Sequence, residues 1–197
     1  TMNCCLFDVQ NVLSGGFEMG NLWYNEPKTL DVAFDVIGDI VLSAASQQYG
    51  GFTVPSVDDI LEPYAEKSHK KHLEKYLSLG LPKEKAEEVA WADLEKEMEQ
   101  GFQGWEYKFN SVSSSRGDYP FITVTAGTNT STYGKLVTIS MLKVRMNGQG
   151  KKGHKKPVLF PKIVFLYDEN LHGPGKELED VFEAGIECSR KTKYPDW

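Results

Sequence analysis

The chain has 197 residues, of which 40% are hydrophobic and 25% are charged, and this composition is typical of one globular domain with enough apolar side chains for a core. The net charge of -6 and the pI near 5.3 exclude the basic surface with which proteins bind duplex nucleic acid. No apolar run approaches the roughly 18 residues of a membrane span, no secretory signal is present, and the odd set Cys4, Cys5 and Cys188 predicts free thiols in the reducing cytoplasm.

The first part of the chain predicts a strand, a connection and a helix. Residues 4–9 form a short apolar run bounded by polar residues, which indicates a buried strand. A glycine-rich connection leads to residues 30–49, whose apolar positions recur every three or four residues as on a helix. Thr29 is expected to cap this helix at its start, and Gly50-Gly51 to end it.

The middle of the chain predicts two long helices. A short strand at 52–54 precedes Ser56, which together with Asp59 has the spacing of a capping box. A helix is therefore expected over 56–79, with a kink at Pro63. The next helix is expected over about 82–110, where apolar residues repeat at helical spacing as far as an aromatic end.

The last part of the chain alternates strands and helices. In chain order, the expected elements are a strand at 119–126, a loop at 127–131, a helix over 136–146, a lysine-rich turn at 151–156, a strand at 158–167 and a helix over 178–189. The nearly continuous apolar run at 158–167 indicates a strand covered on both faces, as in a parallel sheet. This order predicts an α/β fold in which residues 1–197 form one domain without an internal boundary.

Generic motifs do not reveal a function. The sequence has no Walker loop, no GxGxxG after a strand, no HExxH and no GxSxG. His69 and His72 lie on one face of a predicted helix, while His154 and His172 lie in predicted loops. Because no cysteine or carboxylate has a spacing that would complete a tetrahedral site with them, we expect no metal site in this chain.

Seven blocks of sequence, closed by an eighth segment, follow one another in the order found in one enzyme family. They are Asn3-Cys4-Cys5-Leu6, Gly15-Gly16-Phe17-Glu18-Met19-Gly20-Asn21, Glu26-Pro27-Lys28-Thr29, Ala45-Ser46-Gln47-Gln48-Tyr49-Gly50-Gly51, Pro120-Phe121-Ile122-Thr123, Phe160-Pro161-Lys162-Ile163-Val164-Phe165 and Glu187-Cys188-Ser189, then Tyr194-Pro195-Asp196. Over essentially its whole length the chain resembles the catalytic subunit of anaerobic ribonucleoside-triphosphate reductase, the glycyl-radical class of ribonucleotide reductase.

This resemblance implies a fold and a size. Members of the family fold as a ten-stranded α/β barrel entered by a finger loop, and their polypeptides are several times longer. The chain is therefore expected to be the first half of such a barrel and to be inactive alone. The finger-loop cysteine that holds the thiyl radical, the glycine that stores the radical and a cysteine-ligated zinc site are all expected beyond Trp197.

The resemblance also assigns a role to Cys4. In this family a thiyl radical abstracts the 3' hydrogen of the ribose, and the 2' hydroxyl then leaves as water, which requires a proton. The Asn-Cys motif of the family implies that Cys4 is the thiol that supplies this proton. Cys5 should point to the opposite side of the same strand and pack there, and Cys188 is expected in the core.

A polar loop is the second candidate site. Ser114, Ser115, Arg116, Gly117 and Asp118 occupy a position that resembles the loop connecting the effector site of reductases to the substrate. An arginine and a glycine would suit contacts with a phosphate or a base. An ordinary polar loop remains the alternative.

The implied partners follow from the family. They are ribonucleoside triphosphate substrates, dNTP and ATP effectors, a second copy in a homodimer for which the helices at 30–49 and 56–79 are the candidates, and a radical-SAM activating enzyme. The reductant is either formate or a redoxin-type protein. No cofactor is expected within this chain itself, and neither nucleic acid nor a membrane is an expected partner. Two alternatives stay open: another glycyl-radical enzyme of the acyltransferase or lyase type, which would use the adjacent pair Cys4-Cys5, and a non-catalytic truncated piece that only binds nucleotide or dimerises.

Overall fold

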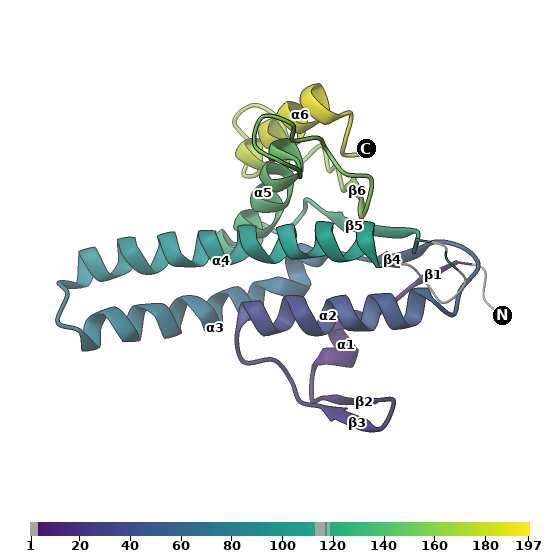
Figure 1. The fold of residues 1–197 in the computed structure, drawn as a ribbon. Coiled ribbons are helices and arrows are strands. Elements are labelled where there is room, and N and C mark those ends of the chain that lie inside the picture. The colour runs from purple at the N-terminus through teal and green to yellow at the C-terminus, as the bar shows by residue number, and fades with distance from the viewer. Residues whose placement is uncertain (1–3, 113–116, 118) are drawn as a thin grey trace.

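A computed structural model describes residues 4–112, 117 and 119–197 and shows alternating strands and helices (Figure 1). In chain order they are β1 (Cys5–Leu6), α1 (Val9–Leu13), β2 (Phe17–Met19), β3 (Leu22–Tyr24), α2 (Leu30–Ala45), β4 (Phe52–Val54), α3 (Val57–Ser78), α4 (Lys83–Ser111), β5 (Ile122–Ala126), α5 (Thr132–Asn147), β6 (Lys162–Phe165) and α6 (Glu179–Thr192). The predicted α/β fold class is confirmed.

The main sheet is parallel throughout. Its four strands lie in the order β1-β4-β5-β6, which is also their order along the chain. Beyond β6, Asp196 forms a parallel bridge with Val164, so the last residues extend the sheet by one more short segment. A parallel sheet whose strands are joined by helices is the expected result of right-handed βαβ connections.

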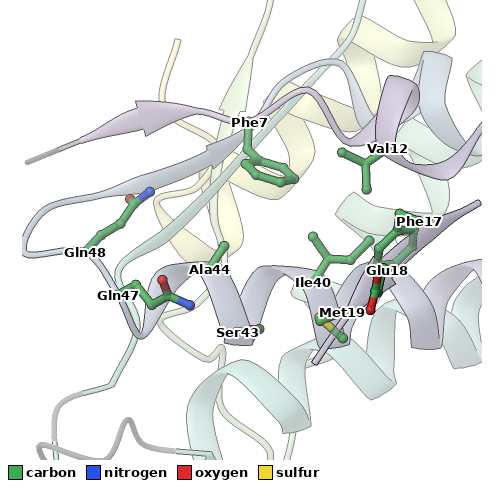
Figure 2. A pocket seen from close by; sticks show the side chains of 10 residues that line it. All are labelled: Phe7, Val12, Phe17, Glu18, Met19, Ile40, Ser43, Ala44, Gln47 and Gln48. Atoms are coloured by element: carbon green, nitrogen blue, oxygen red, sulfur yellow. The ribbon is translucent and has the colours of Figure 1, made fainter. Parts of the chain in front are cut away.

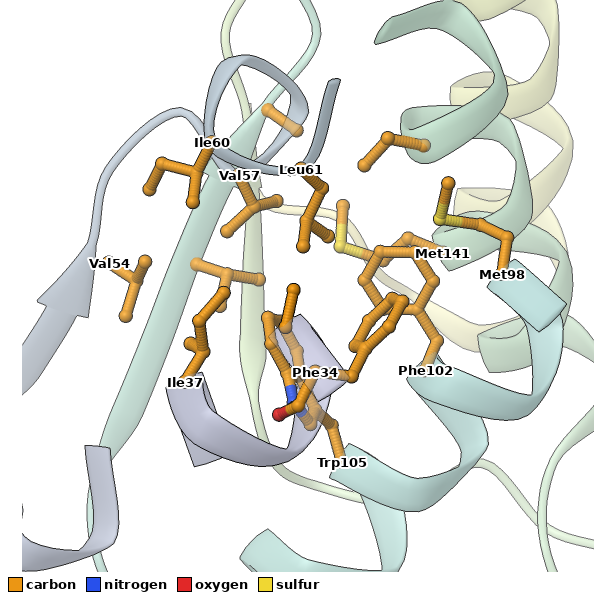
Figure 3. Close-up of a cluster of buried hydrophobic side chains, with 14 of the residues drawn as sticks. Phe34, Ile37, Val54, Val57, Ile60, Leu61, Met98, Phe102, Trp105 and Met141 are labelled. Carbon is orange, nitrogen blue, oxygen red and sulfur yellow. The ribbon is translucent and has the colours of Figure 1, made fainter. Parts of the chain in front are cut away.

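One face of the sheet is packed against the helices. The strand residues on this face are almost completely buried, and they are Phe52, Val54, Ile122, Val124, Ala126, Ile163 and Phe165. Figure 3 shows part of this core, where Phe34 and Ile37 of α2 meet Leu61 of α3 and Phe102 and Trp105 of α4. Alternation along each strand therefore leaves the other face less covered.

An aromatic contact joins α2 and α4 in this core. The rings of Phe34 and Trp105 meet edge to face at 4.9 Å, and the Trp105 indole N–H donates to the carbonyl of Phe34 at 2.8 Å. A Cβ atom on Gly101 would lie only 2.2 Å from the Phe34 ring, so a larger residue there would push the two helices apart. The absence of a side chain at this position allows the aromatic cluster to close.

The long antiparallel pair α3 and α4 extends well past the sheet, as Figure 1 shows. The helix α3 continues through Pro63. The predicted capping box at Ser56 is wrong: this residue has a left-handed backbone with φ of 49° and makes no side-chain cap. Its own N–H instead donates to the Thr125 hydroxyl at 2.8 Å, which ties the start of α3 to β5.

The helix α2 is capped from its neighbours rather than by Thr29. The Thr29 side chain makes no capping hydrogen bond to the helix. Instead, the N–H of Leu30 donates to the Ser68 hydroxyl at 2.9 Å and that of Asp31 to the Glu97 carboxylate at 3.0 Å. The Ser68 hydroxyl and the Glu97 carboxylate thus accept from backbone N–H groups that have no partner within the helix. The negative charge of Glu97 also interacts favourably with the positive end of the helix dipole.

Several predicted segments differ from the structure, and α2 ends at Ala45 rather than at Gly50-Gly51. The connection at 15–24 contains the β2–β3 hairpin, and the expected strand at 4–9 is only two residues long because α1 begins at Val9. The strand expected at 158–167 is confined to β6, and its residues alternate between buried and half-buried. It is therefore covered on one face only within this chain, against the expectation of two covered faces.

A buried ion pair joins α5, α4 and the start of β6. Arg145 is fully buried, and its Nε donates to Glu106 at 2.8 Å while its other amino group donates to the Pro161 carbonyl at 2.6 Å. The guanidinium also lies over the ring of Tyr194 at 5.1 Å, and Gln149 donates to the second Glu106 oxygen at 2.7 Å. Removing one member of such a group leaves a buried charge without its partner.

We expect Arg145→Met to destabilise the folded chain by about 3–5 kcal/mol, because the Glu106 carboxylate would remain buried without its cation. Urea unfolding of the purified chain measures this change. Lys143→Met is the matched control, since Lys143 lies on the same helix and pairs with Glu99 at the surface, with 55% of its side chain exposed. Its loss should cost less than about 1 kcal/mol. Equal effects of the two changes would contradict this reading.

A second buried polar group fixes the loop after β5. Asp58 in the first turn of α3 is fully buried, and its Oδ2 accepts from the N–H groups of Gly127 at 2.9 Å and Asn129 at 3.1 Å. The Nε2–H of His172 donates to the carbonyl of Gly127 at 2.7 Å, while its Nδ1 accepts from the N–H of Asp168. Burial raises the pKa of Asp58 above its ordinary value, although the two amide hydrogen bonds oppose this shift.

The raised pKa of Asp58 predicts a pH dependence. The protonated form is favoured in the folded state, so the contribution of Asp58 to stability is full below the ordinary pKa of 3.8 and is lost as pH rises through the folded value. Asp58→Asn cannot titrate, whereas all other carboxylates are common to both proteins. The free energy of unfolding of the wild type minus that of the variant should therefore fall between acid and neutral pH in urea titrations. A difference that rises with pH would show that the amide hydrogen bonds outweigh burial.

Candidate active site

The second face of the sheet, which we call the open face, is more polar than the helix-facing side. The strand register places Leu6, Thr53, Thr123 and Lys162 side by side in one row across β1, β4, β5 and β6. Leu6 is exposed, and the other members of the row are half-buried. Parallel strands that are covered on both sides are normally apolar on both sides, so the open face is suited to something other than a packed apolar layer.

Cys4 lies at the amino end of this face. It directly precedes β1 and is exposed, and strand alternation places it on the same side as Leu6. Cys5 is on the opposite side, where it is half-buried and accepts a hydrogen bond from Gln48 at 2.8 Å. The two adjacent cysteines therefore face different environments, as alternation along a strand predicts.

The neighbours of Cys4 across the sheet are Gly51 and Phe121. The N–H of Cys5 donates to the Gly51 carbonyl at 3.2 Å, and the N–H of Phe52 donates to the Phe121 carbonyl at 2.9 Å. Gly51 has no side chain to cover the thiol, and the Phe121 ring is half exposed beyond it. The prediction from sequence did not include these two residues, because only the register of β1, β4 and β5 brings them beside Cys4.

The predicted effector loop lies only partly within the described structure. Ser114, Ser115, Arg116 and Asp118 lie outside the described residues. Gly117 is described and has a φ of +83°, a backbone conformation that favours glycine. The loop follows α4, which ends at Ser111, and leads into the strand β5. Because β1 and β5 belong to one parallel sheet, the loop leads into the same amino-terminal end of the strands at which Cys4 lies.

Cys188, His69 and His72 each pack against or contact other side chains of the chain. Cys188 is buried in α6, and burial raises the pKa of its thiol, in agreement with the predicted core position. His69 contacts the Tyr133 hydroxyl at 2.9 Å, and His72 contacts Glu97 at 2.8 Å. Across residues 4–112, 117 and 119–197, no three His, Cys, Asp or Glu side chains gather in a way that could hold a metal ion.

A cavity of about 530 Å³ lies on the side of the sheet away from Cys4. Figure 2 shows Phe7 and Val12 above Ile40 and Ala44 of α2, with Phe17 of the β2–β3 hairpin at one end. Its lining is mainly apolar and has no cysteine, so it does not share the chemistry of the open face.

Within residues 4–112, 117 and 119–197, no helix combines the length and apolarity needed to cross a membrane.

Comparison with known proteins points to one family. A family model described as anaerobic ribonucleoside-triphosphate reductase matches residues 1–197. The anaerobic ribonucleoside-triphosphate reductase of Haemophilus influenzae is 38% identical over 195 residues, which cover 98% of this chain and 27% of that protein. The enzyme of the same name from Enterobacteria phage T4 is 35% identical over 196 residues, which cover 98% of this chain and 32% of that protein.

Solved structures agree at the level of the fold. The anaerobic ribonucleotide reductase from Thermotoga maritima with citrate in the active site superposes with a TM-score of 0.65 over 96% of this chain and 34% of that one, at 15% identity. The same enzyme in complex with dATP and CTP superposes with a TM-score of 0.63 over 96% of this chain and 31% of that one, at 14% identity. The parallel sheet with its helices on one face is thus part of the reductase fold, as expected for part of its barrel.

The chain spans about a third or less of the length of these relatives. The match nevertheless extends over all 197 of its residues and includes the Asn-Cys segment that leads into β1. On this evidence, the chain belongs to the anaerobic ribonucleoside-triphosphate reductase family.

Proposed function

We propose that this chain forms part of the catalytic barrel of an enzyme that reduces ribonucleoside triphosphates to deoxyribonucleoside triphosphates by radical chemistry. The observation that carries the proposal is the accessible thiol of Cys4 on the open face, in a chain whose whole length matches the family. Residues 1–197 would form a single partial domain of that barrel. The residues that hold the radical would lie outside this segment.

The role proposed for Cys4 is to donate a proton and then take part in the later radical steps. The 2' hydroxyl of the ribose leaves as water only when it gains a proton, and a thiol beside the sugar can provide it. The thiol must be accessible to the ligand, and Cys4 is exposed. Gly51 beside it carries no side chain that could stand between the thiol and a ligand.

The positions of the two cysteines favour this role over the acyltransferase alternative. An enzyme that uses an adjacent cysteine pair needs both sulfur atoms to reach one substrate. Cys5 is instead half-buried on the helix-facing side and is hydrogen-bonded to Gln48. The geometry therefore supports a single accessible thiol at this end of β1.

The further parts of the proposal concern partners. By analogy with the Thermotoga enzyme that was solved with dATP and CTP, we propose nucleoside triphosphates as substrates and effectors. Arg116 and its neighbours would contact them in the loop between α4 and β5. The proposal also includes a homodimer, a radical-SAM activating enzyme and a glycyl radical held elsewhere in the enzyme. The proposed location is the cytoplasm.

Cys4→Ala in the full-length protein that contains this sequence should lower kcat by roughly 10²–10⁴-fold, because the leaving hydroxyl loses its proton donor. Deoxynucleotide formation under anaerobic conditions is the measurement. Cys5→Ser is the matched control, since it keeps an acceptor for Gln48, and it should leave turnover near the wild-type value. Wild-type turnover in Cys4→Ala would refute the assigned role.

Titration of the purified chain with dATP or dTTP tests whether a nucleotide site is contained within residues 1–197. If the loop residues contact the phosphates, calorimetry should show saturable binding, and Arg116→Ala should weaken it by at least about tenfold. Lys152→Ala removes the same charge from an exposed turn and should have little effect. Equal weakening by both variants, or no binding at all, would argue against the loop as an effector contact.

A further inference from the structure

The open face carries a continuous polar strip that begins on β4, next to β1, and runs across β5 to β6. Thr53, Thr123 and Lys162 lie in adjacent strands of one row, and each is half-buried. Within the described part of the chain, neither threonine hydroxyl has a hydrogen-bond partner. The row therefore presents hydroxyl groups and an ammonium group toward the side of the sheet that the helices do not cover.

The strip ends in a pair of opposite charges. Lys162 Nζ lies 3.0 Å from Asp196 Oδ2, and the two side chains are 33% and 49% exposed. Asp196 is held as a strand neighbour, because its N–H donates to the Ile163 carbonyl at 2.9 Å and its carbonyl accepts from Phe165 N–H at 2.7 Å. Its carboxylate thus shares the open face with Lys162, and this carboxylate raises the pKa of the ammonium group.

Such a face is costly to cover with apolar side chains. A buried hydroxyl without a partner costs about 1–3 kcal/mol, and a buried ion pair loses hydration that its mutual attraction does not always replace. The helix-facing side of the same strands shows what a packed layer requires, since its strand residues are all apolar. The open face is therefore suited to line a space that holds a polar ligand.

We propose that Lys162 and Asp196 recognise the base of the ribonucleotide whose sugar is reduced beside Cys4, an inference that rests on the proposed function. Lys162 lies three strands across and two residues along from Cys4, which is roughly 16 Å between Cα atoms. This separation is too large for both side chains to contact the same ribose carbon. It is within the span of one nucleotide and two side chains.

The chemistry of the pair selects the base rather than the triphosphate. The ammonium group has two further N–H donors and the carboxylate has an oxygen that can accept, so together they offer the mixture of donors and acceptors found on a base edge. The pair is neutral as a whole and attracts a triphosphate little, while the carboxylate alone would repel phosphate oxygens. A site that hydrogen-bonds its ligand discriminates strongly against ligands that leave its groups unpaired.

The test uses Lys162→Met and Asp196→Asn in the full-length reductase, with kcat/KM measured separately for each of the common ribonucleoside triphosphates at a fixed effector. We expect the ratio of kcat/KM between the preferred and the other bases to change by at least tenfold in both variants. Lys162→Arg, which keeps the donors, should restore most of the wild-type ratio. Lys191→Met is the matched control, because Lys191 pairs with Glu187 on the exposed surface of α6, and it should change no ratio.

Each outcome decides the question. An equal fall of kcat/KM for every base would identify the pair as purely structural, and unchanged ratios would identify it as a bystander; either result overturns the inference. If Lys162→Met does not fold, the nearly isosteric Asp196→Asn supplies the same comparison. A wild-type protein that reduces no ribonucleotide would instead refute the proposed function, so the two failures are distinguishable.

Discussion

The packing of one face of a parallel sheet against helices is the constraint on which the rest of this structure depends. Each strand has few residues, so the hydrophobic contribution comes from the alternate side chains that meet α2, α3, α5 and α6, among them Phe52, Val124 and Phe165. Burial of these residues fixes the register, because a shift by one residue would turn every apolar side chain to the opposite face. The same register then determines what the open face presents.

The site follows from this constraint. Once Phe52, Ile122 and Ile163 face the helices, the residues between them must face away, and Thr53, Thr123 and Lys162 are thereby aligned. Cys4 reaches the open face for the same reason, since it is separated from Leu6 by one residue that points to the helices. The proposed catalytic thiol and the proposed base-recognition pair are thus positioned by core packing and by no direct contact with each other.

Buried polar groups hold the connections around the sheet. Arg145 links α5 and α4 to the segment before β6, and Asp58 holds the loop after β5 through its backbone amides. Each of these side chains has hydrogen-bond partners distant in the chain, although, among the residues that the structure describes, Arg145 Nη1 and Asp58 Oδ1 are buried without one. The start of β6 and the loop after β5 are thereby tied to helices, and an enzyme needs such support if substrate groups are to be held in a defined geometry.

The sequence by itself determined the periodic helices, the strand at the Pro-Phe segment and the family, because helical spacing and the ordered motifs are properties of the linear chain. It also determined that Cys4 and Cys5 would face opposite sides, since that follows from alternation alone. Tertiary structure decided the rest. The β2–β3 hairpin has too few residues to show a period, the cap of α2 comes from Ser68 and Glu97 of other helices, and the row from Thr53 to Lys162 exists only once distant strands pair. These features depend on contacts between segments far apart in the chain, for which a single sequence carries no local signal.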